Sequence, residues 1–382
     1  MFEARIKILD TTLREGEQTP GVYFPAHIKL KIARLLDQLG VYYIESGHPA
    51  VSASIFSSVQ QLSRQGLRSI IAAHSRTMES DVDLALESGA QFLGIFYCVS
   101  SDRLNGVFNK SLSQAVEQIV KTISYAKEQR PELTVRYTPE DTVRSDYENV
   151  FAAAREAVKA GADIISVADT TGFMVPGIRS MYDFVKRLKD DLAESDCHPE
   201  IAVHCHNDRG FALANALDGI RAGATIVDAS VLGLGERAGI VDLAQLATCL
   251  ATEFGQKEEL NLRTFADLYS LVARFAGFSA PPNFPIVGAN AFTHCAGVHT
   301  NAATRNPFHY ESLSPDLFGR ERHFSLDHMS GKSSVQYALE KLGISPVESL
   351  VQFALTEVKK IGETGRMVSL EEFALIVDSH QA

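Results

Sequence analysis

Two histidines separated by one residue stand in the segment HCHND, residues 204–208. The apolar residues before them predict a strand, and residues i and i+2 of a strand point to the same side. His204 and His206 could therefore present two imidazoles to one metal ion, and neutral imidazole suits zinc, manganese or iron. Magnesium would need additional oxygen donors. A hydrogen-bonded structural histidine explains such a pair equally well, so the rest of the sequence has to decide.

A carboxylate that could complete this ligand set stands in the segment DTTLREGEQ, residues 10–18. Charged side chains this dense beside an apolar strand are costly to bury unless each is paired or bound to metal. A metal ion held by Glu15, His204 and His206 could chelate a 2-oxo acid and act as a Lewis acid. The neighbouring Arg14 could then stabilise the negative charge that develops on an oxygen. A solvated loop is the alternative interpretation.

A third segment whose residues could contribute to a site is GLGERAGIVDL, residues 233–243. Its glycines allow a close approach of the backbone, and Glu236 and Arg237 could pair to brace a site. Taken alone, the segment is equally well explained as a glycine-rich turn with a structural ion pair.

The elements that must position these residues alternate along the chain. Short apolar runs alternate with longer amphipathic stretches from residue 5 to about residue 254, which is typical of βα units. Eight such units favour a (β/α)₈ TIM barrel, an α/β fold, over a doubly wound sheet. The expected strands are 5–10, 41–46, 68–74, 92–98, 133–138, 163–169, 200–205 and 225–233.

Polar residues end these strands, and the carboxyl ends of barrel strands form the face that carries active sites. We therefore expect one cluster on that face, made of Asp10, Glu45, His74, Arg136, Thr138, Asp169, His204 and His206.

The alternation of apolar runs and amphipathic stretches stops after the predicted barrel. Residues 1–274 are predicted to form the barrel domain, and residues 275–382 a linker followed by a smaller, mainly helical lid or dimerisation region. The stretch 275–292 is rich in proline and glycine. Helix-like segments follow at 332–344 and 347–363, and a final apolar run lies at 371–380.

Composition excludes several classes of partner. The formal net charge of −11 and the lack of a Lys/Arg-rich run argue against nucleic acid. The five cysteines are scattered without CxxC spacing, which fits a reducing cytoplasm. The N-terminal sequence has neither the layout of a signal peptide nor a membrane span. We expect a cytoplasmic protein that acts on small molecules without a membrane partner.

The motifs in combination resemble those of a known family. DTTLREGEQ, Glu-Asp at 140–141, DTTGF at 169–173, HCHND and GLGERAG occur in the order seen in acyl-CoA-dependent synthases and lyases. That family includes the 2-isopropylmalate, citramalate and homocitrate synthases and the HMG-CoA lyases. The resemblance covers essentially the whole chain.

The resemblance implies a TIM barrel followed by a lid region that is often exchanged across a homodimer. It also implies an acyltransferase that joins acetyl-CoA to a 2-oxo acid and then hydrolyses the thioester. The divalent metal, Mg²⁺, Mn²⁺ or Zn²⁺, would be held by Glu15, His204 and His206, with Arg14 as a catalytic residue.

Within the family, several positions are most similar to the homocitrate synthases of lysine biosynthesis. Ile240 stands where isopropylmalate synthases usually carry a metal-ligating Asn. His74 and Arg136 could hold the far carboxylate of 2-oxoglutarate, because Arg suits bidentate carboxylate pairing. The substrate-binding set implied by the resemblance is completed by Thr138 and Thr170. Alternatively, Arg136 merely pairs with Glu140 or Asp141.

The segment FTHCAGVHTNAATRNPFHYE, residues 292–311, resembles the homocitrate synthase lid. The resemblance implies that His299 and Tyr310 reach over from a partner subunit. Together with Glu140 they would assist deprotonation of the acetyl methyl group, and a His and a carboxylate are suitable proton carriers near pH 7.

Some positions depart from the homocitrate synthase pattern. Cys295 replaces a Lys and Arg209 a Thr or Leu, while GERAG and the segment 47–52 are closer to isopropylmalate synthases. Another acceptor, such as 2-oxoisovalerate, pyruvate or a phosphonate-bearing acid, therefore stays open. Two further alternatives are a lyase, disfavoured because a GCPxxxG-like loop is missing, and a silent metabolite-binding barrel.

Overall fold

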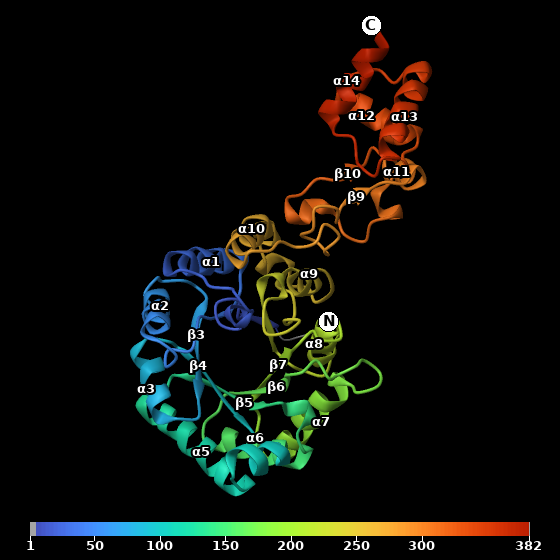
Figure 1. The fold of residues 1–382 in the computed structure, drawn as a ribbon. Coiled ribbons are helices and arrows are strands. Elements are labelled where there is room, and N and C mark those ends of the chain that lie inside the picture. The colour runs from blue at the N-terminus through green and yellow to red at the C-terminus, as the bar shows by residue number, and fades with distance from the viewer. Residues whose placement is uncertain (1–4, 382) are drawn as a thin grey trace. The chain divides into compact units, whose positions relative to one another are not determined.

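The computed structural model describes residues 5–381, which form two compact units that divide between Ser279 and Ala280 (Figure 1). The boundary predicted after residue 274 falls within the last turn of helix α10 (Phe265–Ala276), so the helix keeps its whole length in the first unit.

The first unit is a closed barrel of eight parallel strands, which confirms the predicted fold class. Every predicted strand is present with small shifts at its ends. The largest difference is in the last strand, which ends at Ala229 because Val231–Gly233 form a 3₁₀ turn with Leu232 in the left-handed region. The strands are β1 (Lys7–Asp10), β2 (Tyr43–Glu45), β3 (Ile70–Arg76), β4 (Phe92–Cys98), β5 (Thr134–Glu140), β6 (Ile164–Asp169), β7 (Glu200–Cys205) and β8 (Ile226–Ala229).

Amphipathic helices surround the ring of strands (Figure 1). Their apolar positions recur every three or four residues and face the barrel, as Ile28, Ile32 and Leu36 do in the first helix. Sequence signals set several ends: Ser111 and Gln114 form a capping box, and Gly40 ends the first helix in the left-handed region. The helices are α1 (Ala26–Leu39), α2 (Ala53–Ser63), α3 (Glu79–Glu87), α4 (Ser101–Arg103), α5 (Leu112–Gln129), α6 (Tyr147–Lys159), α7 (Met181–Glu194), α8 (Ala212–Arg221), α9 (Leu243–Glu253) and α10.

The inward-facing side chains of the barrel form two layers of opposite character. The lower layer is an apolar cluster of Leu9, Tyr43, Ala72, Phe92, Ile164, Ala202 and Ile226. Because side chains alternate along a strand, the next inward position of each strand lies two residues later. Those positions hold a polar layer with one glycine: Thr11, Glu45, His74, Gly94, Ser166, His204 and Asp228. On β5 the corresponding residue is Arg136, which is in register with Gly94. The apolar layer closes the barrel, and the polar layer forms the floor above it.

The second unit is mainly helical. Its core is a cluster around Val335, Leu339, Val351 and Phe373. The final apolar run of the sequence forms a helix. The elements are the parallel pair β9 (Thr293–His294) and β10 (His323–Phe324), and the helices α11 (Gly297–Ala303), α12 (Lys332–Lys341), α13 (Glu348–Gly362) and α14 (Leu370–Gln381).

None of the helices in the described part of the chain combines the length and apolar character that a membrane crossing requires.

Close packing of α8 against β7 supports the strand that carries His204 and ends just before His206. We expect Gly219→Ala to destabilise the barrel, because a Cβ at Gly219 would lie 2.7 Å from Cγ1 of Val203. Overpacking costs about 1–3 kcal/mol, which outweighs the helix propensity gain of about 1 kcal/mol. Thermal unfolding should show a lower Tm, with Gly106→Ala as a control because its Cβ would meet open space. An unchanged Tm in Gly219→Ala would contradict this account.

Candidate active site

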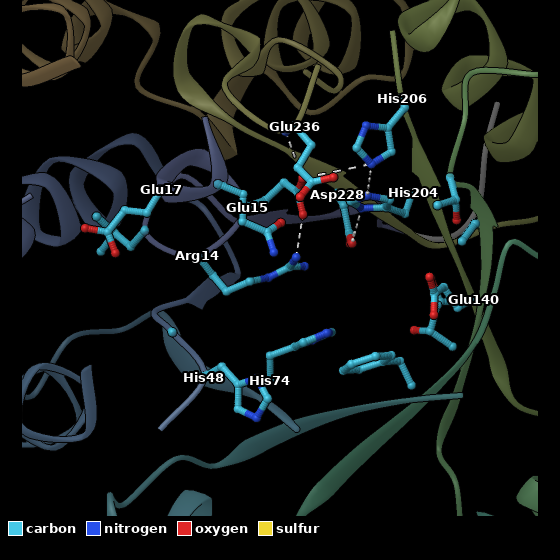
Figure 2. A pocket seen from close by; sticks show the side chains of 18 of the residues that line it. Arg14, Glu15, Glu17, His48, His74, Glu140, His204, His206, Asp228 and Glu236 are labelled. Carbon is cyan, nitrogen blue, oxygen red and sulfur yellow. Dashed lines mark hydrogen bonds and ion pairs between the residues drawn. The ribbon is translucent and has the colours of Figure 1, made fainter. Parts of the chain in front are cut away.

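A cavity of about 490 Å³ opens at the carboxyl ends of the barrel strands (Figure 2). Every barrel residue to which the sequence assigned a catalytic, substrate-binding or metal role lines it. These residues are Arg14, Glu15, His74, Arg136, Thr138, Glu140, Thr170, His204 and His206.

The three predicted metal ligands come together in this cavity. One ligand atom from each of Glu15, His204 and His206 lies within 4.8 Å of the others. The Nε2 atoms of the two histidines face each other at 3.2 Å, and Nε2 of His206 lies 3.9 Å from Oε1 of Glu15. Figure 2 shows the three side chains gathered on one side of the cavity, apart from Glu140. Two imidazoles and one carboxylate suit a divalent ion that keeps positions open for substrate and water.

Asp228 orients one of these histidines. Nδ1–H of His204 donates to Oδ2 of Asp228 over 3.0 Å, which leaves the lone pair of Nε2 directed at the cluster. A carboxylate behind a histidine ligand fixes the ring and raises its basicity. Asp228 is itself held by both oxygens on Nη1 of Arg136, at 2.8 and 2.9 Å. No motif singled out Asp228, although its inward position near the end of the last strand is a usable signal.

Glu45 joins the remaining charges of the polar floor. Its carboxylate accepts hydrogen bonds from Nε of Arg14 and Oγ1 of Thr11, both at 2.6 Å, and from Nδ1 of His74 at 3.2 Å. Nη2 of Arg136 completes the set at 3.3 Å. Arg136 thus pairs with Glu45 and Asp228, and the alternative pairing with Glu140 or Asp141 is wrong. Glu45 was expected in the strand-end cluster without a role of its own; it does not line the cavity but holds the side chains that do.

The carboxylates of the site are held in the ionised form. Burial by itself raises the pKa of Glu15, but Arg14 and the two cluster histidines outweigh it and lower the pKa below its ordinary value. Burial opposes ionisation of Glu45 too, and Arg14 and His74 overcome it, so its pKa lies well below the usual range. Both carboxylates therefore stay available as anions at neutral pH.

The buried histidines are neutral at physiological pH. Burial lowers the pKa of His74 to about 4, and nearby Arg14 acts in the same direction. Burial also lowers the pKa of His206 to about 3, with His204 contributing. A neutral imidazole is the form that ligates metal, so His206 is already in the state that the predicted site requires.

The glycine-rich turn after β8 closes one side of the cluster. The backbone N–H of Glu236 donates to Oε1 of Glu15 over 3.2 Å. Gly239 has φ 76°, and a Cβ there would lie 1.7 Å from the carbonyl oxygen of Gly233, so this turn requires glycine. Arg237 pairs mainly with Asp208, at 2.8 Å, while its distance to Glu236 is 3.6 Å. The expected Glu236–Arg237 brace is therefore secondary.

Glu140 ends β5 and carries a partner that the sequence did not indicate. Nη1 of Arg103, in α4, donates to Oε1 of Glu140 over 2.7 Å. Glu140 lines the cavity, so its carboxylate is placed where a proton acceptor could reach bound substrate.

Two members of the expected strand-end cluster serve the backbone instead. Asp10 accepts from the N–H and hydroxyl of Thr12, and burial raises the pKa of Asp10 to about 7. Asp169 accepts from the N–H groups of Phe173 and Met174. Neither lines the cavity, so the expectation that both belong to the cluster at the site is corrected. The reason is that each carboxylate accepts hydrogen bonds from the turn that follows its strand.

The two threonines of the predicted substrate-binding set line the cavity. Oγ1 of Thr170 accepts from the backbone N–H of Asp141 over 3.0 Å, which ties the loops after β5 and β6 together.

His299 and Tyr310, the predicted lid residues, belong to the second unit. Their rings pack together with centroids 4.1 Å apart, and both side chains are exposed. The thiol of Cys295 donates to Asp327, and a guanidinium nitrogen of Arg209 donates to the carbonyl oxygen of Gly172.

A closed (β/α)₈ barrel with this cluster at the carboxyl ends of its strands defines a barrel enzyme whose site can hold a divalent metal. The chain belongs to the HMGL-like family, whose model matches residues 5–272. Residues 286–366 match the domain described as homocitrate synthase post-HMGL domain-like.

Curated relatives cover nearly the whole chain. The homocitrate synthase of Pyrococcus horikoshii is 46% identical over 93% of this chain and 95% of its own length. That of Sulfolobus acidocaldarius is 38% identical, over 93% of this chain and 75% of its own.

Solved structures support the fold. The HMG-CoA lyase of Pseudomonas aeruginosa has a TM-score of 0.59 at 22% identity, covering 72% of this chain and 94% of that one. The HMG-CoA lyase of Brucella melitensis gives 0.59 at 20% identity, covering 72% and 99%.

Removing one ligand should remove metal binding. We expect His206→Ala and Glu15→Gln to lose Mn²⁺ in equilibrium dialysis, because two donors cannot replace three in a site of this kind. His48→Ala is the matched control, since His48 lines the same cavity outside the cluster. Wild-type affinity in either ligand variant would exclude the proposed ligand set.

The neutral His74 predicts a pH dependence of stability. Its pKa is about 4 in the folded chain against an ordinary value of 6.5, so between these values only the unfolded chain takes up the proton. The free energy of unfolding should fall as the pH drops from 6.5 to 4, by up to about 1.4 kcal/mol per pH unit for this histidine. Urea unfolding in EDTA should show a shallower slope for His74→Gln. His198→Gln, at an exposed histidine, should keep the wild-type slope, and equal slopes for both variants would refute the assignment.

Proposed function

We propose that this chain condenses acetyl-CoA with a 2-oxo acid, with 2-oxoglutarate as acceptor and homocitrate and CoA as products. The observation that carries the proposal is the cluster of Glu15, His204 and His206 beside Arg14 in the barrel cavity. Homocitrate synthases that match nearly the whole chain support it, and so does the match to the metal-dependent HMGL-like family.

The charges of the cavity suit an anionic substrate once a divalent ion is present. Arg14 and Arg136 supply two formal positive charges, against three negative charges from Glu15, Glu45 and Asp228. A divalent cation adds two positive charges beside Arg14, which favours a carboxylate-bearing acceptor at that end of the cavity. Held by Glu15 and the two histidines, the ion supplies Lewis-acid polarisation of a keto oxygen.

Arg14 is placed to stabilise developing charge. Its Nε and Nη1 bind Glu45 and Glu15, which fix the plane of the guanidinium. Among the described residues Nη2 has no hydrogen-bond partner, and the side chain lines the cavity. This free donor can bind the oxygen of the keto group as it gains negative charge during attack.

Glu140 is the proposed base. Its carboxylate removes a proton from the acetyl methyl group, and the resulting carbanion attacks the keto carbon. A new C–C bond forms as the C=O π pair moves to the oxygen, which then takes the proton from Glu140. Water then hydrolyses the thioester and releases CoA. The ion pair with Arg103 holds the Glu140 carboxylate at the cavity wall. We further propose that His299 and Tyr310 assist this proton transfer from the partner subunit of a homodimer.

The polar floor favours a dicarboxylic acceptor. His74 and Arg136 line the cavity, and a purely aliphatic acceptor would bury its tail against polar groups without pairing them. The alternative is a 2-isopropylmalate- or citramalate-type synthase. The apolar side chains of Val51, Ile55 and Phe96, which also line the cavity, favour this alternative. Under the main proposal the enzyme serves lysine biosynthesis in the cytoplasm.

A thiol-release assay with acetyl-CoA and a panel of 2-oxo acids tests the proposal. With Mg²⁺ or Mn²⁺ we expect 2-oxoglutarate to give the highest kcat/KM. His74→Leu should lower kcat/KM for 2-oxoglutarate about tenfold or more, because a buried hydrogen-bonding group for a charged acceptor is lost. The same variant should keep or improve activity with 2-oxoisovalerate. An equal loss across all acceptors would count against His74 as a selector, and no thiol release with any acid would remove the proposed activity.

A further inference from the structure

One polar side chain at the floor of the cavity has no hydrogen-bond partner among the residues that the structure describes. Ser166 lies in the middle of β6, its side chain lines the cavity, and the residue is 0% exposed. Its hydroxyl makes no hydrogen bond. Buried polar groups nearly always have a partner, so an orphan hydroxyl that faces a cavity indicates a group that a ligand completes.

A second orphan donor belongs to the neighbouring strand. Arg136 is 2% exposed, and its Nη1 and Nη2 are consumed by Asp228 and Glu45. Its Nε makes no hydrogen bond. Since Arg136 pairs with Ile164 in the register of β5 and β6, Ser166 lies one inward position further along its strand. The cavity floor therefore presents two free donors from adjacent strands, the Nε–H of Arg136 and the hydroxyl of Ser166.

Within this polar layer, the register of β6 and β7 places Ser166 deeper than the proposed metal ligand His204. His204 is opposite Ala168, whereas Ser166 is opposite Ala202, so Ser166 is one inward position deeper than His204. Two residues along a strand span about 6.6 Å, comparable with a short carbon chain. An acceptor whose keto end lies at Glu15, His204 and His206 would therefore direct its tail toward Ser166.

Gly94 keeps the floor open. It occupies the inward position of β4 between His74 and Arg136. A Cβ there would lie 3.3 Å from Nδ1 of His74 and 3.5 Å from Nη2 of Arg136. A larger side chain would crowd His74 and the guanidinium of Arg136, including its free Nε.

We propose that Ser166 is a specificity-determining residue whose hydroxyl donates a hydrogen bond to the distal carboxylate of a dicarboxylic 2-oxo acid, next to Nε of Arg136. The inference rests on the proposed condensation and names the group that reads the far end of the acceptor. A carboxylate is the chemistry that fits, because it accepts from both donors and is attracted by the guanidinium. A cation is disfavoured beside Arg136, and an alkyl tail would leave both donors unpaired.

The test compares wild type with Ser166→Ala on two acids of equal chain length, 2-oxoglutarate and 2-oxovalerate. Calorimetric Kd values with Mg²⁺ and steady-state KM values are both measured. We expect Ser166→Ala to bind 2-oxoglutarate about tenfold or more weakly, because the lost hydrogen bond is made to a charged group. The Kd for 2-oxovalerate and the KM for acetyl-CoA should change less than twofold. The Tm should not fall, since the hydroxyl has no hydrogen-bond partner in the described part of the chain.

Ser75→Ala is the matched control. Ser75, in β3, is equally buried, but its hydroxyl donates to the carbonyl of Arg76 and does not line the cavity. It should leave the preference between the two acids unchanged. Ser166→Cys keeps nearly the volume of serine with a weaker donor, and an intermediate loss for 2-oxoglutarate is expected.

The outcomes separate this inference from the proposed function. If wild type condenses 2-oxoglutarate and Ser166→Ala binds it as tightly as wild type, the inference fails alone. The same holds if Ser166→Ala weakens both acids equally, since the serine would then shape the barrel rather than read the carboxylate. If wild type neither binds nor condenses 2-oxoglutarate, both proposals fail.

Discussion

The structure depends on the pairing of charges in the layer directly above the apolar core of the barrel. Glu45 and Asp228 are almost completely buried, and an unpaired carboxylate at such depth would be strongly destabilising. Arg136 binds both carboxylates. Arg14 is a second partner of Glu45, and His204 is a second partner of Asp228. Because every charge is held by at least one opposite or hydrogen-bonding group, the site is rigid before any ligand arrives.

This network also explains how the proposed metal ligands acquire their geometry. Asp228 turns the His204 ring, and Arg14 and the backbone of Glu236 hold Glu15. The ligands are thus set by groups that do not themselves belong to the cluster, as is usual for metal sites. The tight turn at Gly239 lets the backbone after β8 approach Glu15 closely.

The two units carry different side chains of the proposed chemistry. The barrel supplies the charged floor, the cluster and Glu140, all positioned by strands and the turns that follow them. The second unit has its own apolar core and brings His299 and Tyr310 together on its surface. Under the proposal, catalysis needs both, which gives a physical reason for a dimer in which one chain covers the site of the other.

The sequence alone determined the barrel, because alternating apolar and amphipathic segments fix strands and helices locally, and the motif positions at strand ends placed nine candidate residues around one cavity. It did not determine which carboxylates face substrate: Asp10 and Asp169 cap backbone turns, whereas Asp228 and Glu45 organise the floor. It also gave no indication of the Arg103–Glu140 pair or the orphan hydroxyl of Ser166. Partners of this kind come from strands far apart in the chain, so only the closed barrel, with its register and layers, decides them.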